Sequence, residues 1–154
     1  MNKKIRVGAL CVGFCLAAGC TTVRDTRPSI EYFPEATPGA AYSAAVRVGD
    51  VLYLTGQIGT RADGSVPDSI QEQTRLALES MSTELKSRGR SLDDVFKCSV
   101  MLDDISEWAD FNKVYVTFFK PGRLPARNAF GVEGLAFPGL KVELVCLAHS
   151  PASR

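Results

Sequence analysis

Histidine and metal-binding motifs are almost absent from the 154-residue sequence. Its only histidine is His149, near the C-terminus, and no cysteines and histidines occur at the spacing of metal ligands. The sequence also has no glycine-rich loop of the kind that cradles phosphate groups, and no serine, histidine and acid set typical of nucleophilic catalysis. These absences argue against metal, nucleotide and triad chemistry, and we expect no metal and no cofactor.

The chain has no large excess of either charge. It contains 18 lysines and arginines against 17 aspartates and glutamates. Residues 1–19 include Lys3, Lys4 and Arg6 but no acid, so a chain beginning at Cys20 has 15 basic and 17 acidic side chains, a net charge of −2. A broad nucleic-acid surface is normally built from clustered lysines and arginines. We therefore expect no nucleic-acid partner.

No apolar run is long enough to span a bilayer comfortably. The run Val7 to Ala18 follows a basic start and ends in small residues directly before Cys20. This pattern resembles the lipobox of bacterial lipoproteins, in which the cysteine becomes the lipidated first residue; an uncleaved short anchor is the alternative. Either reading predicts an exported domain on the periplasmic side, tethered to a membrane. Thr21 after the cysteine favours the outer membrane, by resemblance to sorted lipoproteins.

Two cysteines, Cys98 and Cys146, remain in strand-like segments of the expected mature domain. An oxidising compartment would permit a disulfide, but its formation requires adjacent Cβ atoms. We expect free, buried thiols. Residues 20–40 contain three prolines and are expected to form an extended, poorly ordered tether. A single domain is then expected over residues 41–150.

Periodic patterns predict an α+β domain. β-rich runs at residues 44–48 and 51–58 flank Gly49-Asp50, a good hairpin signal, and Asp63-Gly64 marks another turn. Strands are also expected in the two final apolar segments and at residues 95–102. In the latter, alternation with polar or less buried positions predicts that one face packs on the core, with Phe96, Cys98, Val100 and Leu102. The order is two strands, helix, strand, helix, two strands, which predicts a mixed sheet with both helices packed on one face.

Two amphipathic helices are expected between these strands. Ser69 and Glu72 have the spacing of a capping box, as do Asp104 and Glu107. The stripe of the first helix comprises Ile70, Thr74, Ala77, Met81 and Leu85, and that of the second comprises Trp108, Phe111, Tyr115 and Phe118. The aromatic stripe resembles a base-stacking platform, but its helical spacing favours a core face.

Two charged residues interrupt the final apolar segments. Arg127 lies in the run from Ala126 to Val132, and Glu143 lies between Val142 and Leu144. An unpaired buried charge is costly, so each is expected to have a partner or a ligand. A guanidinium suits a small carboxylate or phosphate, and a nearby carboxylate suits the orientation of a water. A structural ion pair between Arg127 and Glu143 is the alternative.

Several motifs together resemble the RidA/YjgF family of enamine and imine deaminases. They are AAVRVGDVLYLTGQIG, EQTRLALESM, SLDDVFKCSVMLDDISEWADFNKVYVTFF and the closing PAR and VEL, and the resemblance extends from Tyr42 to Ala148. It implies a chorismate-mutase-like subunit that assembles as a homotrimer, with three sites in the clefts between subunits. The implied reaction is the cofactor-free hydrolysis of 2-aminoacrylate-type enamines or imines to 2-oxo acids and ammonia.

The resemblance also implies roles for individual residues. Arg127 matches the arginine that grips the substrate carboxylate, and Glu143 matches the acid that positions the attacking water. Four further positions match residues around the substrate: Tyr42, Thr55, Gly56 and Asn112. Thr55 stands where serine is usual, and it keeps the hydroxyl.

Two positions beside the arginine depart from the family pattern. Asn128 stands where serine is usual, and Ala129 stands in place of a frequent cysteine. Ala129 is expected to contribute backbone groups to the substrate site. Activity therefore does not require the thiol of the usual cysteine at this position. Because most reactive enamines arise in the cytoplasm, export suggests either a different imine or a 2-oxo acid binding trimer without turnover. Ribonuclease activity, claimed for some relatives, is disfavoured by the charge.

Overall fold

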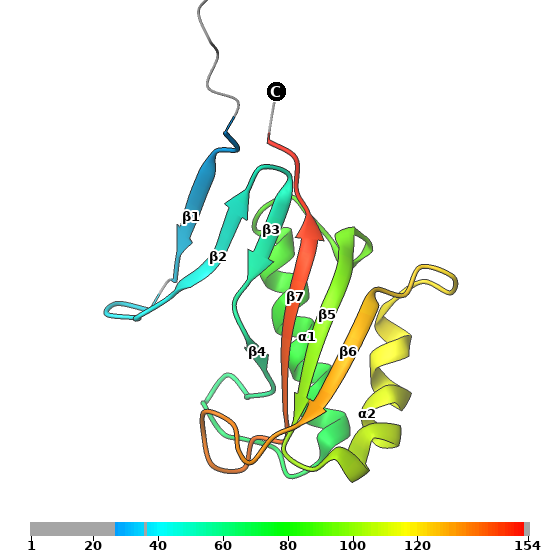
Figure 1. Ribbon diagram of the computed structural model, residues 1–154. Helices are drawn as coiled ribbons and strands as arrows, with labels where there is room; N and C mark the ends of the chain where they lie inside the picture. The colour runs from blue at the N-terminus through cyan, green and yellow to red at the C-terminus, as the bar shows by residue number, and fades with distance from the viewer. Residues whose placement is uncertain (1–26, 36, 153–154) are drawn as a thin grey trace, which may run out of the picture.

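The computed structural model describes residues 27–35 and 37–152, and these form one mixed sheet backed by two helices (Figure 1). The strand order is β1-β2-β3-β7-β5-β6, and the short β4 also pairs with β7. The strands are β1 Ile30–Pro34, β2 Ser43–Val48, β3 Val51–Leu54, β4 Gln57–Ile58, β5 Val95–Leu102, β6 Ala126–Gly131 and β7 Val142–His149. Only β5 and β6 are parallel. The predicted fold class is confirmed.

The chain enters the sheet earlier than the sequence suggested. β1 pairs antiparallel with β2, and Phe33 lies opposite Ala45. The expectation of a poorly ordered tether is therefore wrong for residues 30–34, because backbone hydrogen bonds to β2 offset the cost of ordering them. The predicted signal segment and Cys20 lie outside the described residues. Since every strand and helix of the described residues follows Ser29, a chain beginning at Thr21 contains all of them.

The first helix, α1, spans Ile70–Lys86 and begins as predicted. The backbone N–H of Glu72 donates to the Ser69 hydroxyl at 3.1 Å. The carboxylate of Glu72 accepts from Arg61 instead of completing the box. The predicted stripe is buried along its whole length. Beyond the helix, the N–H of Arg90 donates to the Leu85 carbonyl across Gly89, whose φ is 67°, the hydrogen bond of a Schellman C-cap.

Strand β5 has the predicted bounds but not the predicted alternation throughout. Cys98, Val100 and Leu102 are buried, whereas Phe96 is 44% exposed and Val95 is buried in its place. The register between β5 and β7 shifts between Val95 and Lys97. This β-bulge reverses the side-chain pattern at the start of the strand, so the prediction that Phe96 faces the core is wrong.

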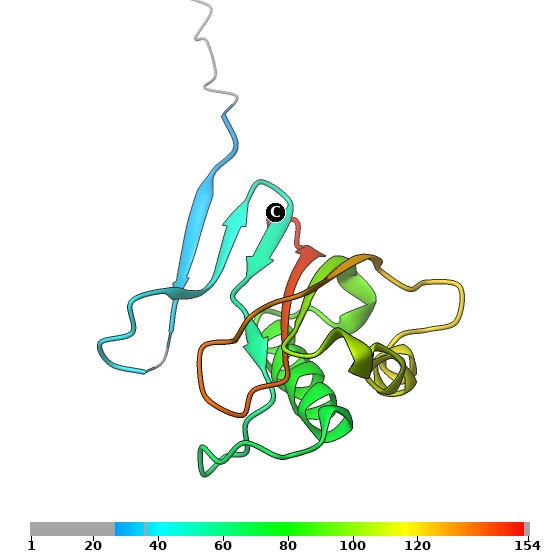
Figure 2. The ribbon, with the colours of Figure 1, turned by 60° about the horizontal axis from the view of Figure 1, so that its bottom comes forward.

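The second helix, α2, spans Trp108–Tyr115 and is extended at both ends by 3-10 turns. The Asp104 carboxylate accepts from the N–H of Ser106 rather than from that of Glu107. Phe111 and Tyr115 are buried, and Trp108 and Phe118 pack against the core from its edge. Both helices lie on the same side of the sheet (Figure 2).

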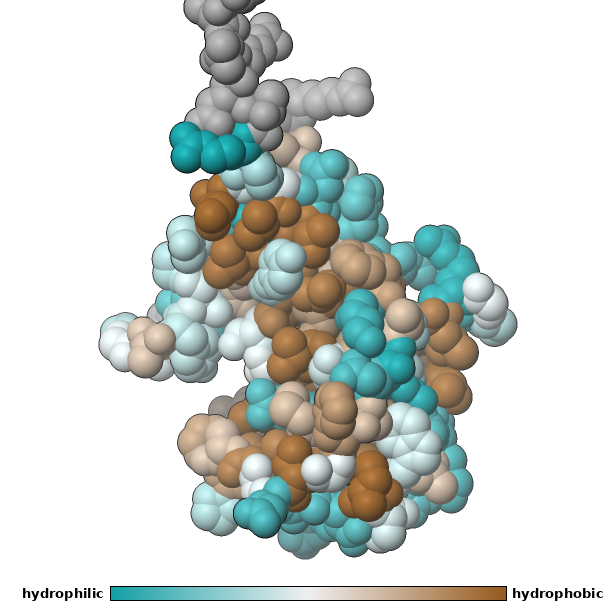
Figure 3. All heavy atoms as spheres, in the orientation of Figure 1, coloured by the Kyte–Doolittle hydropathy of each residue, from teal (hydrophilic) through white to brown (hydrophobic). Residues whose placement is uncertain are grey.

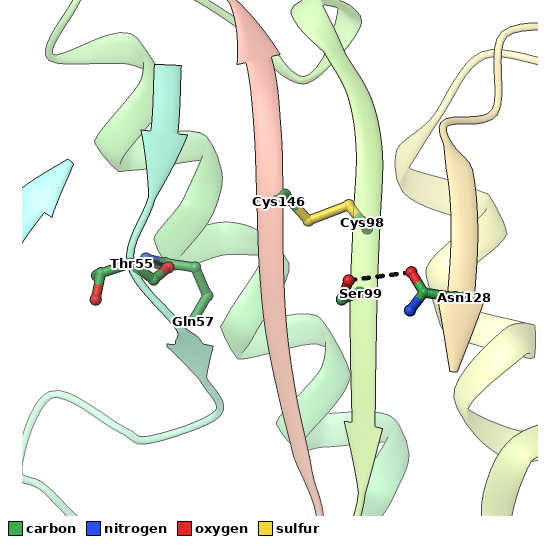
Figure 4. The surroundings of a disulfide bond; sticks show 6 residues. All are labelled: Thr55, Gln57, Cys98, Ser99, Asn128 and Cys146. Atoms are coloured by element: carbon green, nitrogen blue, oxygen red, sulfur yellow. Dashed lines mark hydrogen bonds between the residues drawn. A yellow bond between two sulfur atoms is a disulfide. The ribbon is translucent and has the colours of Figure 1, made fainter. Parts of the chain in front are cut away.

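The two strand cysteines form a disulfide between β5 and β7 (Figure 4). Cys98 lies directly opposite Cys146 in the antiparallel register, and both are fully buried. The expectation of free thiols is therefore wrong. Sequence reasoning missed the bond because the pairing register of two strands 48 residues apart sets whether their Cβ atoms are adjacent.

No helix of the described residues covers the face of the sheet opposite α1 and α2 (Figure 1). This face presents apolar side chains on several strands, among them Tyr53 on β3, Phe130 on β6 and Val145 on β7. Figure 3 shows hydrophobic residues spread over the face of the molecule on this side. Within the described part of the chain, no helix has the length and apolar character needed to cross a bilayer.

Candidate functional site

Arg127 is held on the helix side of β6 by the aromatic residues of α2. Its guanidinium carbon lies 4.3 Å from the centre of the Trp108 ring and 4.4 Å from that of Tyr115. Phe111 is the third ring, at 5.6 Å. A cation over aromatic faces is stabilised by their quadrupoles. The predicted aromatic stripe therefore does more than fill the core, since it also holds the side chain of Arg127 in place.

Arg127 retains hydrogen-bonding capacity in this position. Its Nη1 is buried and, among the described residues, has no hydrogen-bond partner. Burial lowers the pKa of the Arg127 guanidinium, and Tyr115 partly opposes that change. An arginine nevertheless stays protonated at physiological pH. Burial likewise raises the pKa of the Tyr115 phenol, which therefore stays neutral. The site thus holds a fixed positive charge ringed by apolar surfaces.

A cavity of about 300 Å³ opens beside this guanidinium. It is lined by Trp108, Tyr115, Val116, Leu124, Pro125, Arg127, Asn128 and Ala129. Two residues that sequence reasoning singled out, Arg127 and Ala129, thus border one cavity. Trp108 and Tyr115 were assigned only to the core, because helical spacing does not reveal which ring at the end of a stripe borders a cavity.

The neighbouring asparagines differ in what they contact. The Ser99 hydroxyl on β5 donates to Asn128 Oδ1 at 3.0 Å, as Figure 4 shows. Asn112 lies on α2 next to Phe111, and its Oδ1 is buried with no hydrogen-bond partner among the described residues. A buried oxygen without a donor is costly. Asn112 therefore has an acceptor available for a ligand or a second chain.

Glu143 lies on β7, opposite both Met101 of β5 and Ile58 of β4. Its carboxylate rests against the backbone of Gly56, so closely that a Cβ atom there would lie 1.8 Å from Oε1. The absence of a side chain at Gly56 makes room for this carboxylate. No hydrogen bond or ion pair within the described residues engages the carboxylate.

Tyr42, Thr55 and Gly56 border a second cavity, of about 370 Å³. It lies where β3 ends and β4 begins, and Tyr42 at its rim is 59% exposed. The Thr55 carbonyl accepts from the Gln57 side-chain amide at 3.2 Å. The Thr55–Gly56 break between β3 and β4 interrupts the single strand predicted over residues 51–58. The interruption puts Gly56, which has no side chain, next to the Glu143 carboxylate.

The predicted site residues therefore form two separate groups: the Arg127 half-site, which borders the first cavity, and the Glu143 half-site beside Gly56. Arg127 shares a row of the sheet with Cys98 and Cys146, which face the helices. Glu143 is three residues from Cys146 and so points to the opposite face, because strand side chains alternate. The alternative of an ion pair between the two is wrong for a single chain. Among the described residues, no group of three or more histidine, cysteine or acidic side chains could hold a metal ion.

The fold and the two half-sites define a small α+β domain with two cavities at its surface. The family model described as Endoribonuclease L-PSP matches residues 34–150. The chain belongs to this family. The predicted resemblance to RidA/YjgF proteins is confirmed, because a YjgF-family protein from Neisseria meningitidis has the same fold, with a TM-score of 0.70 and 27% identity over 81% of this chain and 98% of that one.

Curated relatives are similar over most of the domain. The mitochondrial protein mmf2 of Schizosaccharomyces pombe is 37% identical over 112 residues, 71% of this chain and 88% of that protein. A rat protein named 2-iminobutanoate/2-iminopropanoate deaminase is 36% identical over 110 residues, 70% of this chain and 79% of that one.

Proposed function

We propose that the protein hydrolyses 2-imino acids and their enamine tautomers to 2-oxo acids and ammonia. The observation that carries the proposal is the partly buried guanidinium of Arg127, which borders a cavity and whose buried Nη1 has no hydrogen-bond partner among the described residues. The deaminase names of the rat and mouse relatives support the same chemistry. In the reaction, water adds to the C=N carbon, the C–N bond breaks, and its electron pair leaves with nitrogen as ammonia. No electrons are gained or lost overall, so water is the only co-reactant.

Arg127 binds the substrate carboxylate. A planar guanidinium donates two parallel hydrogen bonds to a carboxylate, and the aromatic rings around Arg127 restrict its rotation. The low-dielectric surroundings strengthen this contact. Fixing the carboxylate fixes the adjacent imine carbon, and positioning of this kind lowers the barrier to attack by water.

Glu143 positions and deprotonates the attacking water. Its carboxylate has no basic partner within the described residues and lies against Gly56, where a ligand can approach the backbone. General base help of this kind contributes on the order of 10²- to 10⁴-fold to the rate. Because Arg127 and Glu143 face opposite sides of one sheet, a complete site forms where the Arg127 cavity of one copy meets the Glu143 carboxylate of the next copy.

A closed ring of three copies satisfies this requirement. The two half-sites occupy different surfaces, which makes the interface heterologous, and such interfaces close into rings when the rotation permits. Burial of the apolar sheet face in the assembly supports this arrangement, since exposed apolar patches mark interaction surfaces. Each ring of three then holds three equivalent sites.

The test is ammonia and 2-oxo acid release by the chain from Thr21 to Arg154, with imino acids generated in place by an amino-acid oxidase. We expect acceleration over the uncatalysed rate, and its loss in Arg127→Ala. Arg75→Ala removes an exposed arginine of α1 and is the matched control. No acceleration, with 2-oxo acids still bound by the unmutated protein, would establish the non-catalytic binding trimer instead. RNA cleavage that depended on Arg127 would point to the activity in the family's description.

We also propose that the domain is exported and held on a membrane by lipid attached to Cys20. The Cys98–Cys146 disulfide supports an oxidising compartment, since disulfides persist outside the cytoplasm. The imine that the enzyme meets there differs from those released in the cytoplasm. Mass spectrometry of the membrane fraction tests this, and a Cys20→Ser protein that stayed equally membrane-bound would contradict it.

A further inference from the structure

A third cavity, of about 330 Å³, lies on the helix side of the sheet at the end where the chain enters β1. It belongs to neither half-site. Three arginines from two parts of the chain line it: Arg47 on β2, and Arg88 and Arg90 on the turn after α1. The φ of 67° at Gly89 forms the tight turn that separates Arg88 from Arg90. Ser87 and Ser150 add two hydroxyl groups.

The carboxylates around this cavity are fewer than its arginines. Glu31 pairs with Arg47, and Glu84 pairs with Arg88. Among the described residues, Arg90 donates only to neutral oxygens, the Ser150 hydroxyl at 3.2 Å and the Pro151 carbonyl at 2.8 Å. The group of side chains therefore carries an excess of one positive charge. In addition, Nε of Arg88 is buried with no hydrogen-bond partner among the described residues.

One arginine serves the fold as well as the cavity. Arg88 stacks over the Phe33 ring at 4.7 Å and donates to the Glu84 carbonyl at the end of α1. It thereby fixes β1 against the helix and neutralises the negative end of the helix dipole. Arg47 is only 17% exposed, although its side chain is charged. These contacts hold two guanidinium groups rigidly beneath β1, so the cavity needs little rearrangement to bind an anion.

We propose that this cavity binds a phosphate group, either free or as the headgroup of an anionic phospholipid. Arginine forks match the oxygens of carboxylate and phosphate, but three forks, one from β2 and two from the turn after α1, suit a tetrahedral group with three or more acceptors better than a planar one with two. Assembly through the opposite sheet face leaves the cavity open. It also lies beside β1, the first strand after the proposed lipid attachment at Cys20.

The test is calorimetric titration of inorganic phosphate into the chain from Thr21 to Arg154. We expect Arg90→Gln to weaken binding at least tenfold. Arg75→Gln, which removes an exposed arginine paired with Glu79 outside the cavity, is expected to change it less than twofold. Equal losses in both variants would show diffuse surface attraction and overturn the proposal, as would the absence of binding at millimolar phosphate.

Arg90→Gln could weaken phosphate binding indirectly, by displacing the C-terminal segment that Arg90 contacts, so a second variant is needed. Glu31→Gln removes the carboxylate that competes for Arg47 and contacts neither Arg90 nor Ser150. Phosphate binding is expected to tighten several-fold. Unchanged or weaker binding, in a protein whose melting temperature is retained, would overturn the proposal.

The source of the phosphate is distinguished with vesicles of phosphatidylcholine, with and without phosphatidylglycerol. Co-sedimentation that requires phosphatidylglycerol and Arg90, and that inorganic phosphate competes away, identifies the ligand as a lipid headgroup. Phosphate binding without vesicle binding identifies a soluble phosphate compound. Failure of both arms overturns the proposal, whatever the outcome of the deaminase assay.

Discussion

Arg127 and Glu143 project from opposite faces of the same sheet, one among the rings of α2 and the other against Gly56. One chain therefore cannot bring both to one small substrate. The strands that carry them, β6 and β7, are not neighbours, since β5 lies between them in the sheet. This arrangement makes assembly a requirement of the proposed chemistry.

Complementation between inactive variants tests this relationship directly. Arg127→Ala and Glu143→Gln are each expected to abolish most deaminase activity. Mixed by refolding in equal amounts, they are expected to recover about a quarter of the unmutated activity, because one interface in four then joins an intact Arg127 half-site to an intact Glu143 half-site. Deaminase assays before and after mixing provide the measurement. No recovery, despite mixed oligomers detected by native mass spectrometry, would place both residues in one chain's site.

The sequence predicted most elements because their signals are local. The α1 stripe, the Ser69 cap and the Gly49 turn each depend on residues within a few positions of one another. The relation of Arg127 to Glu143 is not local. Alternation places each residue on one of the two faces of the sheet. Which face Arg127 or Glu143 occupies depends on how β6 and β7 align with β5, because a shift of one residue in register moves every side chain of a strand to the other face.

The misses share a cause of the same kind. β1 is a strand because β2 lies beside it, and its own residues, bounded by Pro28 and Pro34, gave only a tether signal. Phe96 faces outward because of a bulge against β7. The disulfide depends on the same β5–β7 register. Candidate residues could thus be named from the sequence, whereas their division into two half-sites required the fold.

Gly56→Ala is expected to lower activity without unfolding the domain. The new Cβ would meet the Glu143 carboxylate, which is the movable end of a side chain and can swing aside. Folding survives, but the carboxylate leaves its position, so we expect a loss of about 10²-fold or more in the deaminase rate. Thermal melting and the ammonia assay measure the two effects separately.

Two other glycines serve as controls for this substitution. A Cβ at Gly134 meets open space, so Gly134→Ala is expected to change neither property. A Cβ at Gly59 would lie 2.2 Å from the Gln73 carbonyl oxygen, which is fixed in α1. Gly59→Ala is therefore expected to destabilise the fold by about 1–3 kcal/mol. Full activity in Gly56→Ala would show that Glu143 has no defined place in the reaction.

The cap at Asp104 is expected to make stability depend on pH in acid. Hydrogen bonds from Ser106 lower the pKa of the Asp104 carboxyl below 3.8. Its contribution is thus present above that value and is lost as the pH falls through the lower folded pKa. Asp104→Ala should lower the melting temperature at about pH 7, and the difference from the unmutated protein should shrink in stronger acid. Asp104→Asn, an uncharged cap, is the control, and a difference independent of pH in Asp104→Ala would contradict the expectation.

The disulfide between Cys98 and Cys146 is expected to contribute substantially to stability. A cross-link between residues 48 positions apart restricts the unfolded chain, and such bonds typically add about 2–4 kcal/mol. Reductant should therefore lower the denaturation midpoint of the chain from Thr21 to Arg154, in which these are the only cysteines. The double variant Cys98→Ala, Cys146→Ala should unfold at about the reduced midpoint and be insensitive to reductant. Two reactive thiols in the denatured, unreduced protein would show that the bond does not form.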